Sequence, residues 1–229
     1  MPESTEITIP VPNGPDGAGM PATLVRPDSP MGAGIVLVQE IFGRTAYMRK
    51  RAMDLAENGY TVVLPQVYWR IGIDDIPEDS PDALMVAVGH SQAVDWDQAV
   101  ADIRTAITWL RADPESEHAV ALVGFCFGGG LAYAALQGVR GPEHADALVS
   151  YYGSALPNLV DGPTVHAASL HHFGDADAFI PREAIDHIRE VVEADGAEFH
   201  LWDDANHAFD NPTPELGLHD PRASREAWE

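Results

Sequence analysis

The stretch GFCFGGG, residues 124–130, contains the only cysteine of the 229-residue chain, Cys126. The apolar run HAVALVGF, residues 118–125, leads into it, and a helical pattern at 127–137 follows it. Strand, glycine, cysteine, glycine and helix in this order form the G-x-S-x-G nucleophile-elbow pattern, with cysteine in the position of serine. Such a turn is sharp, so the residues two places away must lack bulk, as Gly124 and Gly128 do. The pattern predicts that Cys126 points out from the carboxyl edge of a sheet, and a buried structural cysteine is the alternative.

Apolar runs alternate with helical patterns on both sides of this turn. We expect buried parallel strands at 33–40, 60–66, 118–125, 146–152 and 166–174, and a strand nearer an edge at 197–203. We expect helices at 45–58, 92–112, 127–137 and 181–194, an antiparallel hairpin at 5–11 and 21–27, and a polar loop at 72–83. This order predicts an α/β fold with a mostly parallel central sheet and helices on both faces, built as a single domain over residues 1–229.

Composition limits the setting and the partners. The hydrophobic fraction of 45% suits one sizeable core, and a lone cysteine excludes an internal disulfide. We see neither a signal peptide nor an apolar run of about 20 residues, so we expect a cytoplasmic soluble protein, a monomer or a weak homodimer. Asp and Glu number 36 against 13 Lys and Arg, which gives a net charge of -23. Nucleic acid and membrane partners are therefore not expected, and the acidic surface is either simply well solvated or adapted to salt.

A cysteine nucleophile needs a base, and the base needs a carboxylate to orient it. Asp175 follows the predicted strand 166–174, and His207 follows the predicted strand 197–203. Both therefore lie at the same sheet edge as Cys126, in the chain order nucleophile, acid, histidine. We predict a Cys126–His207–Asp175 triad, with the backbone N–H of Phe127 facing the reacting carbonyl.

Several stretches in order along the chain resemble the dienelactone hydrolase family of the α/β-hydrolase superfamily. They are QEIFG (39–43), GYTVVLPQVYWR (59–70), GFCFGG (124–129), YYG (151–153), FGDADAFIP (173–181) and NHAF (206–209). The resemblance implies an α/β-hydrolase fold, the triad named above, an accessory carboxylate at Glu40, and an oxyanion hole formed by the amides of Ile41 and Phe127. It implies hydrolysis of a small-molecule carboxylic ester or lactone through an acyl-thioester, with no cofactor and no metal. A thioesterase or general esterase on the same triad, and a non-catalytic binding protein that retains the fold, are the alternatives.

The expected substrate contacts depart from the family in charge. Where the family places an arginine shortly after the catalytic histidine, this chain has Asn211, and Arg44 and Arg70 are the nearest basic candidates. We take these three residues and Tyr151 as candidate substrate-binding residues, and we expect an anionic dienelactone to be a poor substrate. The adjacent residues His171 and His172 suggest a metal site. Neighbouring strand residues point to opposite faces, however, so we expect that they share no ion.

Overall fold

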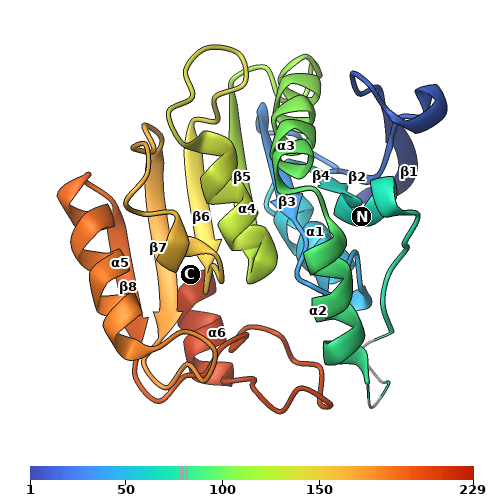
Figure 1. Cartoon of the computed structure of the whole chain (residues 1–229). Coiled ribbons are helices and arrows are strands. Elements are labelled where there is room, and N and C mark those ends of the chain that lie inside the picture. The colour runs from blue at the N-terminus through green and yellow to red at the C-terminus, as the bar shows by residue number, and fades with distance from the viewer. Residues whose placement is uncertain (78–79, 81) are drawn as a thin grey trace.

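One eight-stranded sheet runs through the whole molecule (Figure 1). The computed structural model describes residues 1–77, 80 and 82–229; residues 78, 79 and 81 of the predicted loop 72–83 lie outside the described residues. The spatial strand order is β1-β2-β4-β3-β5-β6-β7-β8. The strands are β1 (Glu3–Ile9), β2 (Met20–Arg26), β3 (Ala33–Val38), β4 (Thr61–Pro65), β5 (Ala119–Phe125), β6 (Ala147–Tyr151), β7 (Ala168–Gly174) and β8 (Glu198–Trp202).

The pairing directions explain where polar side chains can gather. The strands β3 to β8 run parallel, whereas β1 and β2 form an antiparallel hairpin that joins β4. Because the carboxyl ends of parallel strands share one edge, the segments after β3, β5, β7 and β8 meet there. The predicted hairpin, the parallel sheet and the edge position of β8 are confirmed.

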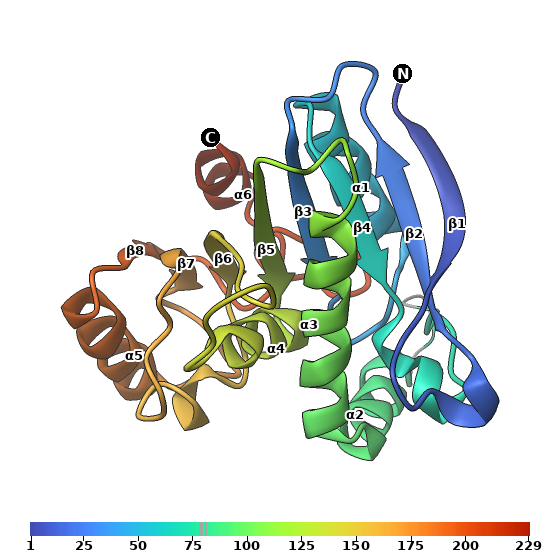
Figure 2. The same ribbon diagram turned by 90° about the horizontal axis from the view of Figure 1, so that it is seen from above.

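Helices cover both faces of the sheet, as Figure 2 shows from above. They are α1 (Ala46–Glu57), α2 (Ala83–Ala93), α3 (Trp96–Arg111), α4 (Phe127–Leu136), α5 (Arg182–Ala194) and α6 (Pro221–Trp228). One face carries α1 and α6, whose apolar side chains form one core cluster with the sheet. The other face carries α3, α4 and α5 over a second cluster. The α/β fold with helices on both faces is therefore confirmed.

The region predicted as one helix contains parts of two helices in the structure. The expected helix at 92–112 is interrupted at Val94, whose backbone is extended with a ψ of 130°. Asp95 then starts α3, because its side chain accepts a hydrogen bond from the N–H of Gln98. The preceding helix, α2, begins at Ala83, where a loop was expected, and it lies near the carboxyl edge of the sheet (Figure 1).

No helix within the described part of the chain combines the length and the apolar character that a membrane span requires.

Candidate active site

Cys126 sits in a strained turn between β5 and α4. Its φ of 53° and ψ of -116° lie in a region that costs a non-glycine residue about 1–3 kcal/mol. The flanking glycines are required by close backbone approach: a Cβ on Gly124 would lie 2.3 Å from the carbonyl oxygen of Gly128, and one on Gly128 would lie 2.3 Å from that of Gln39. The Cys126 carbonyl accepts hydrogen bonds from the N–H groups of Gly129 and Ser154, at 3.1 and 3.0 Å, which hold the turn.

His207 joins the cysteine to a carboxylate. Its Nε2 lies 3.1 Å from Cys126 Sγ, and its Nδ1 lies 2.8 Å from Asp177 Oδ2. Since a carboxylate can only accept, Nδ1–H donates to Asp177, and Nε2 is the nitrogen that faces the sulfur. The rings of Tyr152 and Phe179, each with its centroid 5.1 Å from that of His207, pack against the imidazole. The three polar groups thus form one continuous chain of contacts.

The partner of His207 is Asp177, so the predicted pairing with Asp175 is wrong. The side chain of Asp177 is fully buried, and its second oxygen accepts from the N–H groups of Phe179 and Ile180, both at 2.8 Å. These bonds aim Oδ2 at His207. Asp175 instead accepts from the N–H of Asp204 at 2.7 Å and so ties the segment after β8 to the end of β7. Both acids stand at the predicted sheet edge, but the chain turns between them.

The electrostatics of the site favour a charged imidazole. Burial lowers the pKa of His207, but the Cys126 sulfur and the Asp177 carboxylate outweigh burial and raise the pKa to about 10. These two neighbours therefore favour the imidazolium form of His207 beside the sulfur.

Glu40 follows β3 and is buried beside the cavity that holds Cys126. Its two oxygens accept from Asn211 Nδ2 at 2.7 Å and from the Tyr152 hydroxyl at 3.2 Å. Burial, followed by nearby acidic groups, raises the pKa of Tyr152 well above its usual range, so this hydroxyl keeps its proton and donates. Asn211 thus contacts Glu40, where a substrate contact was expected, although both residues belong to the region around the site.

The two predicted oxyanion donors belong to the loop after β3 and to the start of α4. Ile41 lines the cavity, and its carbonyl accepts from the Tyr68 hydroxyl at 2.6 Å, which fixes the orientation of this loop. Phe127 is the first residue of α4, and its ring packs against Tyr68. Among the described residues no backbone carbonyl accepts from the amides of Ile41 or Phe127.

A cavity of about 570 Å³ opens above Cys126 and His207. Its described lining is mainly apolar, and it contains the acidic residues Glu40 and Glu215 but no lysine or arginine. The remaining lining residues include Phe179 and side chains from α2 and from the segment between β8 and α6: Ala83, Leu84, Val88, Ala208, Leu216 and Leu218.

Three of the predicted substrate contacts are not among the described residues that line this cavity. Arg44 is buried against Glu6 and Thr23, at 2.7 and 3.1 Å. Arg70 forms two bonds of 2.8 Å with Asp102. Both arginines therefore form ion pairs with acidic residues of the protein itself. Tyr151 is core: its ring stacks on Phe125 with centroids 4.5 Å apart, and its hydroxyl donates to the Ala227 carbonyl.

Asp210 is the main structural residue that the sequence did not reveal. It is fully buried, and its carboxylate accepts from Arg51 at 2.6 and 2.8 Å, from the Ser224 hydroxyl at 2.6 Å, and from the Tyr47 hydroxyl. These partners come from α1 and α6, so Asp210 anchors the segment that carries His207. Its charge is matched by Arg51. The sequence contains no local pattern that pairs residues 51 and 210.

His171 and His172 point to opposite faces of β7. His171 packs on Tyr133 of α4, whereas His172 stacks with Tyr151 and Trp202 on the other face. Within the described part of the chain, no group of three or more His, Cys, Asp or Glu side chains could hold a metal ion.

The parallel sheet, the strained elbow after β5, and the histidine and aspartate after β8 and β7 together define an α/β hydrolase. The chain belongs to the dienelactone hydrolase family, whose model matches residues 20–229. It is 34% identical over 198 residues to carboxymethylenebutenolidase of Pseudomonas putida, which covers 85% of this chain and 82% of the relative. It is 32% identical over 183 residues to carboxymethylenebutenolidase 1 of Cupriavidus pinatubonensis, with 77% and 73% covered.

Solved structures agree with this membership. A structure assigned to a dienelactone hydrolase of Klebsiella pneumoniae has a TM-score of 0.79 at 26% identity and covers 100% of this chain and 95% of that chain. The dienelactone hydrolase of Anabaena variabilis has the same fold, with a TM-score of 0.66 at 19% identity and coverage of 99% and 95%. The protein is therefore a hydrolase that acts on ester or lactone bonds.

Proposed function

We propose that this protein hydrolyses uncharged carboxylic esters or lactones with Cys126 as nucleophile, His207 as acid and base, and Asp177 as the group that orients His207. The single observation that carries the proposal is the chain of contacts from Cys126 Sγ to His207 Nε2 at 3.1 Å and from His207 Nδ1 to Asp177 at 2.8 Å. We propose that one domain, residues 1–229, performs the reaction without a cofactor or metal.

The reaction proceeds in two halves. The Cys126 thiolate attacks the ester carbonyl carbon, a C–S bond forms, and the carbonyl electron pair moves to oxygen. When the pair returns, the C–O bond breaks, and the His207 imidazolium gives its proton to the departing alkoxide. Neutral His207 then takes a proton from water as that water attacks the thioester. The thiolate leaves, and the carboxylic acid is released.

The amides of Ile41 and Phe127 hold the oxyanion in both halves. One such donor typically lowers the barrier by about 3 kcal/mol. Glu40 stays at the rim of this site, held by Asn211 and Tyr152, and as a carboxylate it disfavours an anionic substrate.

The charge of the cavity supports an uncharged substrate. The described lining contains the carboxylates of Glu40 and Glu215 but no lysine or arginine. Both ring nitrogens of His207 are already paired, with Asp177 and Cys126. A substrate carboxylate would therefore be desolvated without a free cationic partner. Losing one charged hydrogen bond costs about 1.5–3 kcal/mol, which is roughly a ten- to hundredfold loss in kcat/KM. The methyl ester of a dienelactone should therefore be preferred at least about tenfold over the free acid. A preference for the free acid would overturn this part of the proposal.

A substrate panel tests the proposal as a whole. Lactones, aryl esters and thioesters are assayed with the wild-type protein and with Cys126→Ser, which keeps the size of the side chain but removes the thiolate. We expect neutral esters or lactones to be cleaved and Cys126→Ser to lose at least about a hundredfold in kcat/KM. Preference for thioesters would support the thioesterase alternative, and no turnover of any class would support the binding-protein alternative.

A further inference from the structure

The helix α2 places apolar side chains at the mouth of the cavity, where they are both lining and surface. Leu84 and Val88 line the cavity while 44% and 38% of their surface remains exposed, and Phe179, between β7 and α5, also lines it with 55% exposed. These three residues are hereafter the apolar rim. At these positions the apolar surface of the cavity is continuous with exposed apolar surface outside it.

Helix geometry separates this rim from the rest of α2. With about 100° between successive residues, Ala83 and Ala87 fall on one side, Leu84 and Val88 on the next, and Val86 on the far side. The accessibilities agree, because Ala83 and Ala87 are buried and the cavity lining includes Leu84 and Val88 but not Val86. Val86 is 41% exposed, so it matches Val88 in residue type and exposure and differs only in facing away from the cavity.

The charge pattern sets α2 apart from the surrounding surface. In the chain as a whole 21% of residues are charged, yet residues 83–94 contain no Asp, Glu, Lys or Arg. The exposed side chains of α2 at the rim are apolar, so contact with water does not stabilise them. Covering them with apolar material is therefore favourable. The observed continuity with the cavity above Cys126 makes a part of the substrate the natural cover.

We infer that the preferred substrates are esters with an apolar arm, an alkyl or aryl chain that runs from Cys126 through the cavity and onto the apolar rim. The inference rests on the proposed function, because it describes the substrate of the same site. Each methylene that leaves water against this surface strengthens transition-state binding, up to about fourfold in kcat/KM for full burial. Short esters leave the rim exposed and gain none of this.

Two chain-length series test the inference. One series lengthens the acyl side, as the p-nitrophenyl esters of acetate, butyrate and octanoate, and the other lengthens the alcohol side, as methyl, butyl and octyl esters of one acid. All are measured below their aggregation concentrations with wild type, Val88→Asp and the matched control Val86→Asp. We expect kcat/KM to rise about tenfold or more from the shortest to the longest member in at least one series. Val88→Asp should reduce that ratio about tenfold, whereas Val86→Asp should leave it unchanged.

The outcomes separate the two proposals. If no ester is cleaved in a Cys126-dependent way, the proposed function fails. If esters are cleaved but both series are flat, the inference fails and the proposed function stands. Equal effects of Val88→Asp and Val86→Asp would also overturn it, since only one of them faces the cavity. Circular dichroism and melting curves check that both variants fold, and Leu84→Ser, on the same rim, replaces Val88→Asp if that variant does not.

Discussion

Asp177 and Asp175 lie two residues apart but have different hydrogen-bond partners, and this difference can be measured. Asp177→Asn keeps the size of the side chain but removes the charge that faces Nδ1 of His207, so we expect kcat to fall at least about a hundredfold. Asp175→Asn is the matched control: its oxygen can still accept from the N–H of Asp204, and we expect less than about a threefold loss in kcat/KM. The measurement is steady-state hydrolysis of a neutral ester. A larger loss in Asp175→Asn than in Asp177→Asn would restore the original assignment.

The same pair shows how far the sequence could identify the site. The positions of Cys126 and His207 follow from strand ends, because a parallel sheet brings the ends of its strands to one edge. Which of two nearby acids reaches the histidine depends on the turn at the end of β7, and there Asp177 is oriented by the N–H groups of Phe179 and Ile180. The conformation of that turn depends on a few backbone dihedral angles, which strand topology does not determine.

At the scale of elements, the pair Arg51–Asp210 joins α1 to the segment that carries His207. Removing one member of a buried pair leaves an uncompensated charge, so we expect Arg51→Met to lower the free energy of unfolding by about 3–5 kcal/mol. The double variant Arg51→Met, Asp210→Asn removes both charges and should recover part of that loss. Urea unfolding of the two single variants and the double variant gives the coupling energy. Purely additive losses would show that the pair does not act as a unit.

The buried histidines of β7 give the fold a sensitivity to acid. Burial lowers the pKa of His171 to about 4, whereas the unfolded chain has its usual pKa near 6.5. Between these values the unfolded state binds a proton that the folded state does not, so stability is complete above about pH 6.5 and is lost as pH falls toward 4.

The variant His171→Leu separates the contribution of His171 from the rest of the pH dependence of stability. The wild-type free energy of unfolding should fall by about 1.4 kcal/mol per pH unit more steeply than that of the variant over this range. Urea unfolding at several pH values measures both slopes, and equal slopes would contradict a neutral, buried His171. His172 is present in both proteins, and burial is the largest cause that lowers its pKa, so most of its own contribution cancels.

Elements differed in how well their sequences predicted them. Strands β3 to β7 were recognisable because strands buried on both faces read as nearly continuous apolar runs. The helix α2 was missed because its apolar residues lie on several sides and show no helical period, and because its start lies in a stretch rich in proline and acids. The break at Val94 depends on Asp95 capping α3, which is a single hydrogen bond.

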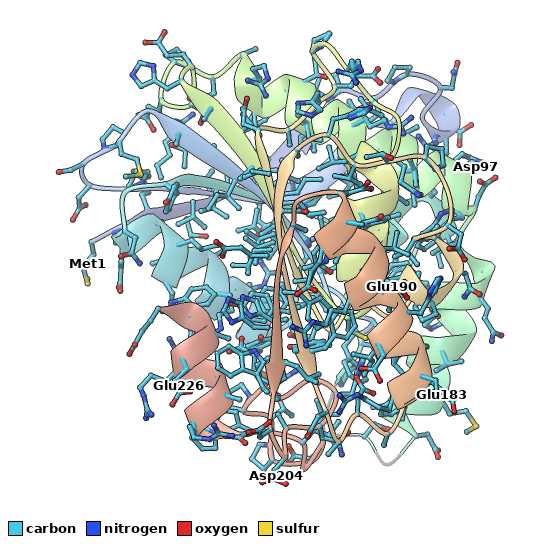
Figure 3. All side chains as sticks on the ribbon, turned by 90° about the vertical axis from the view of Figure 1, so that its left-hand side faces the viewer. Met1, Asp97, Glu183, Glu190, Asp204 and Glu226 are labelled. Atoms are coloured by element: carbon cyan, nitrogen blue, oxygen red, sulfur yellow. The ribbon has the colours of Figure 1, made fainter. Side chains whose placement is uncertain are left out.

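At the scale of the whole molecule, acidic side chains dominate the surface. Figure 3 labels several of them, Asp97, Glu183, Glu190, Asp204 and Glu226, which lie at the surface on several parts of the chain. Every lysine and arginine except Arg104 and Arg140 pairs with a described acidic residue. An excess of acidic side chains remains after this pairing and gives the net charge of -23, so these side chains repel one another.

Salt should therefore stabilise the protein. The Debye length falls from about 10 Å at 0.1 M to about 3 Å at 1 M, which screens repulsion between exposed charges. Exposed ion pairs are weakened too, but each contributes only about 0–1 kcal/mol. We expect the melting temperature to rise between low and molar sodium chloride, a salt chosen because sulfate would also strengthen apolar burial. A flat or falling melting temperature would show that the acidic surface is not under net electrostatic strain.

The most direct test of the catalytic account is to look for the acyl group on Cys126. The protein is mixed with a neutral aryl ester, quenched in acid during turnover and digested, and the peptide that contains Cys126 is weighed by mass spectrometry. We expect one acyl group, bound as a thioester to Cys126, and none in Cys126→Ser treated in the same way. Rapid hydrolysis by the wild-type protein and by Cys126→Ala at equal rates, with no acyl group on the peptide, would contradict a cysteine nucleophile.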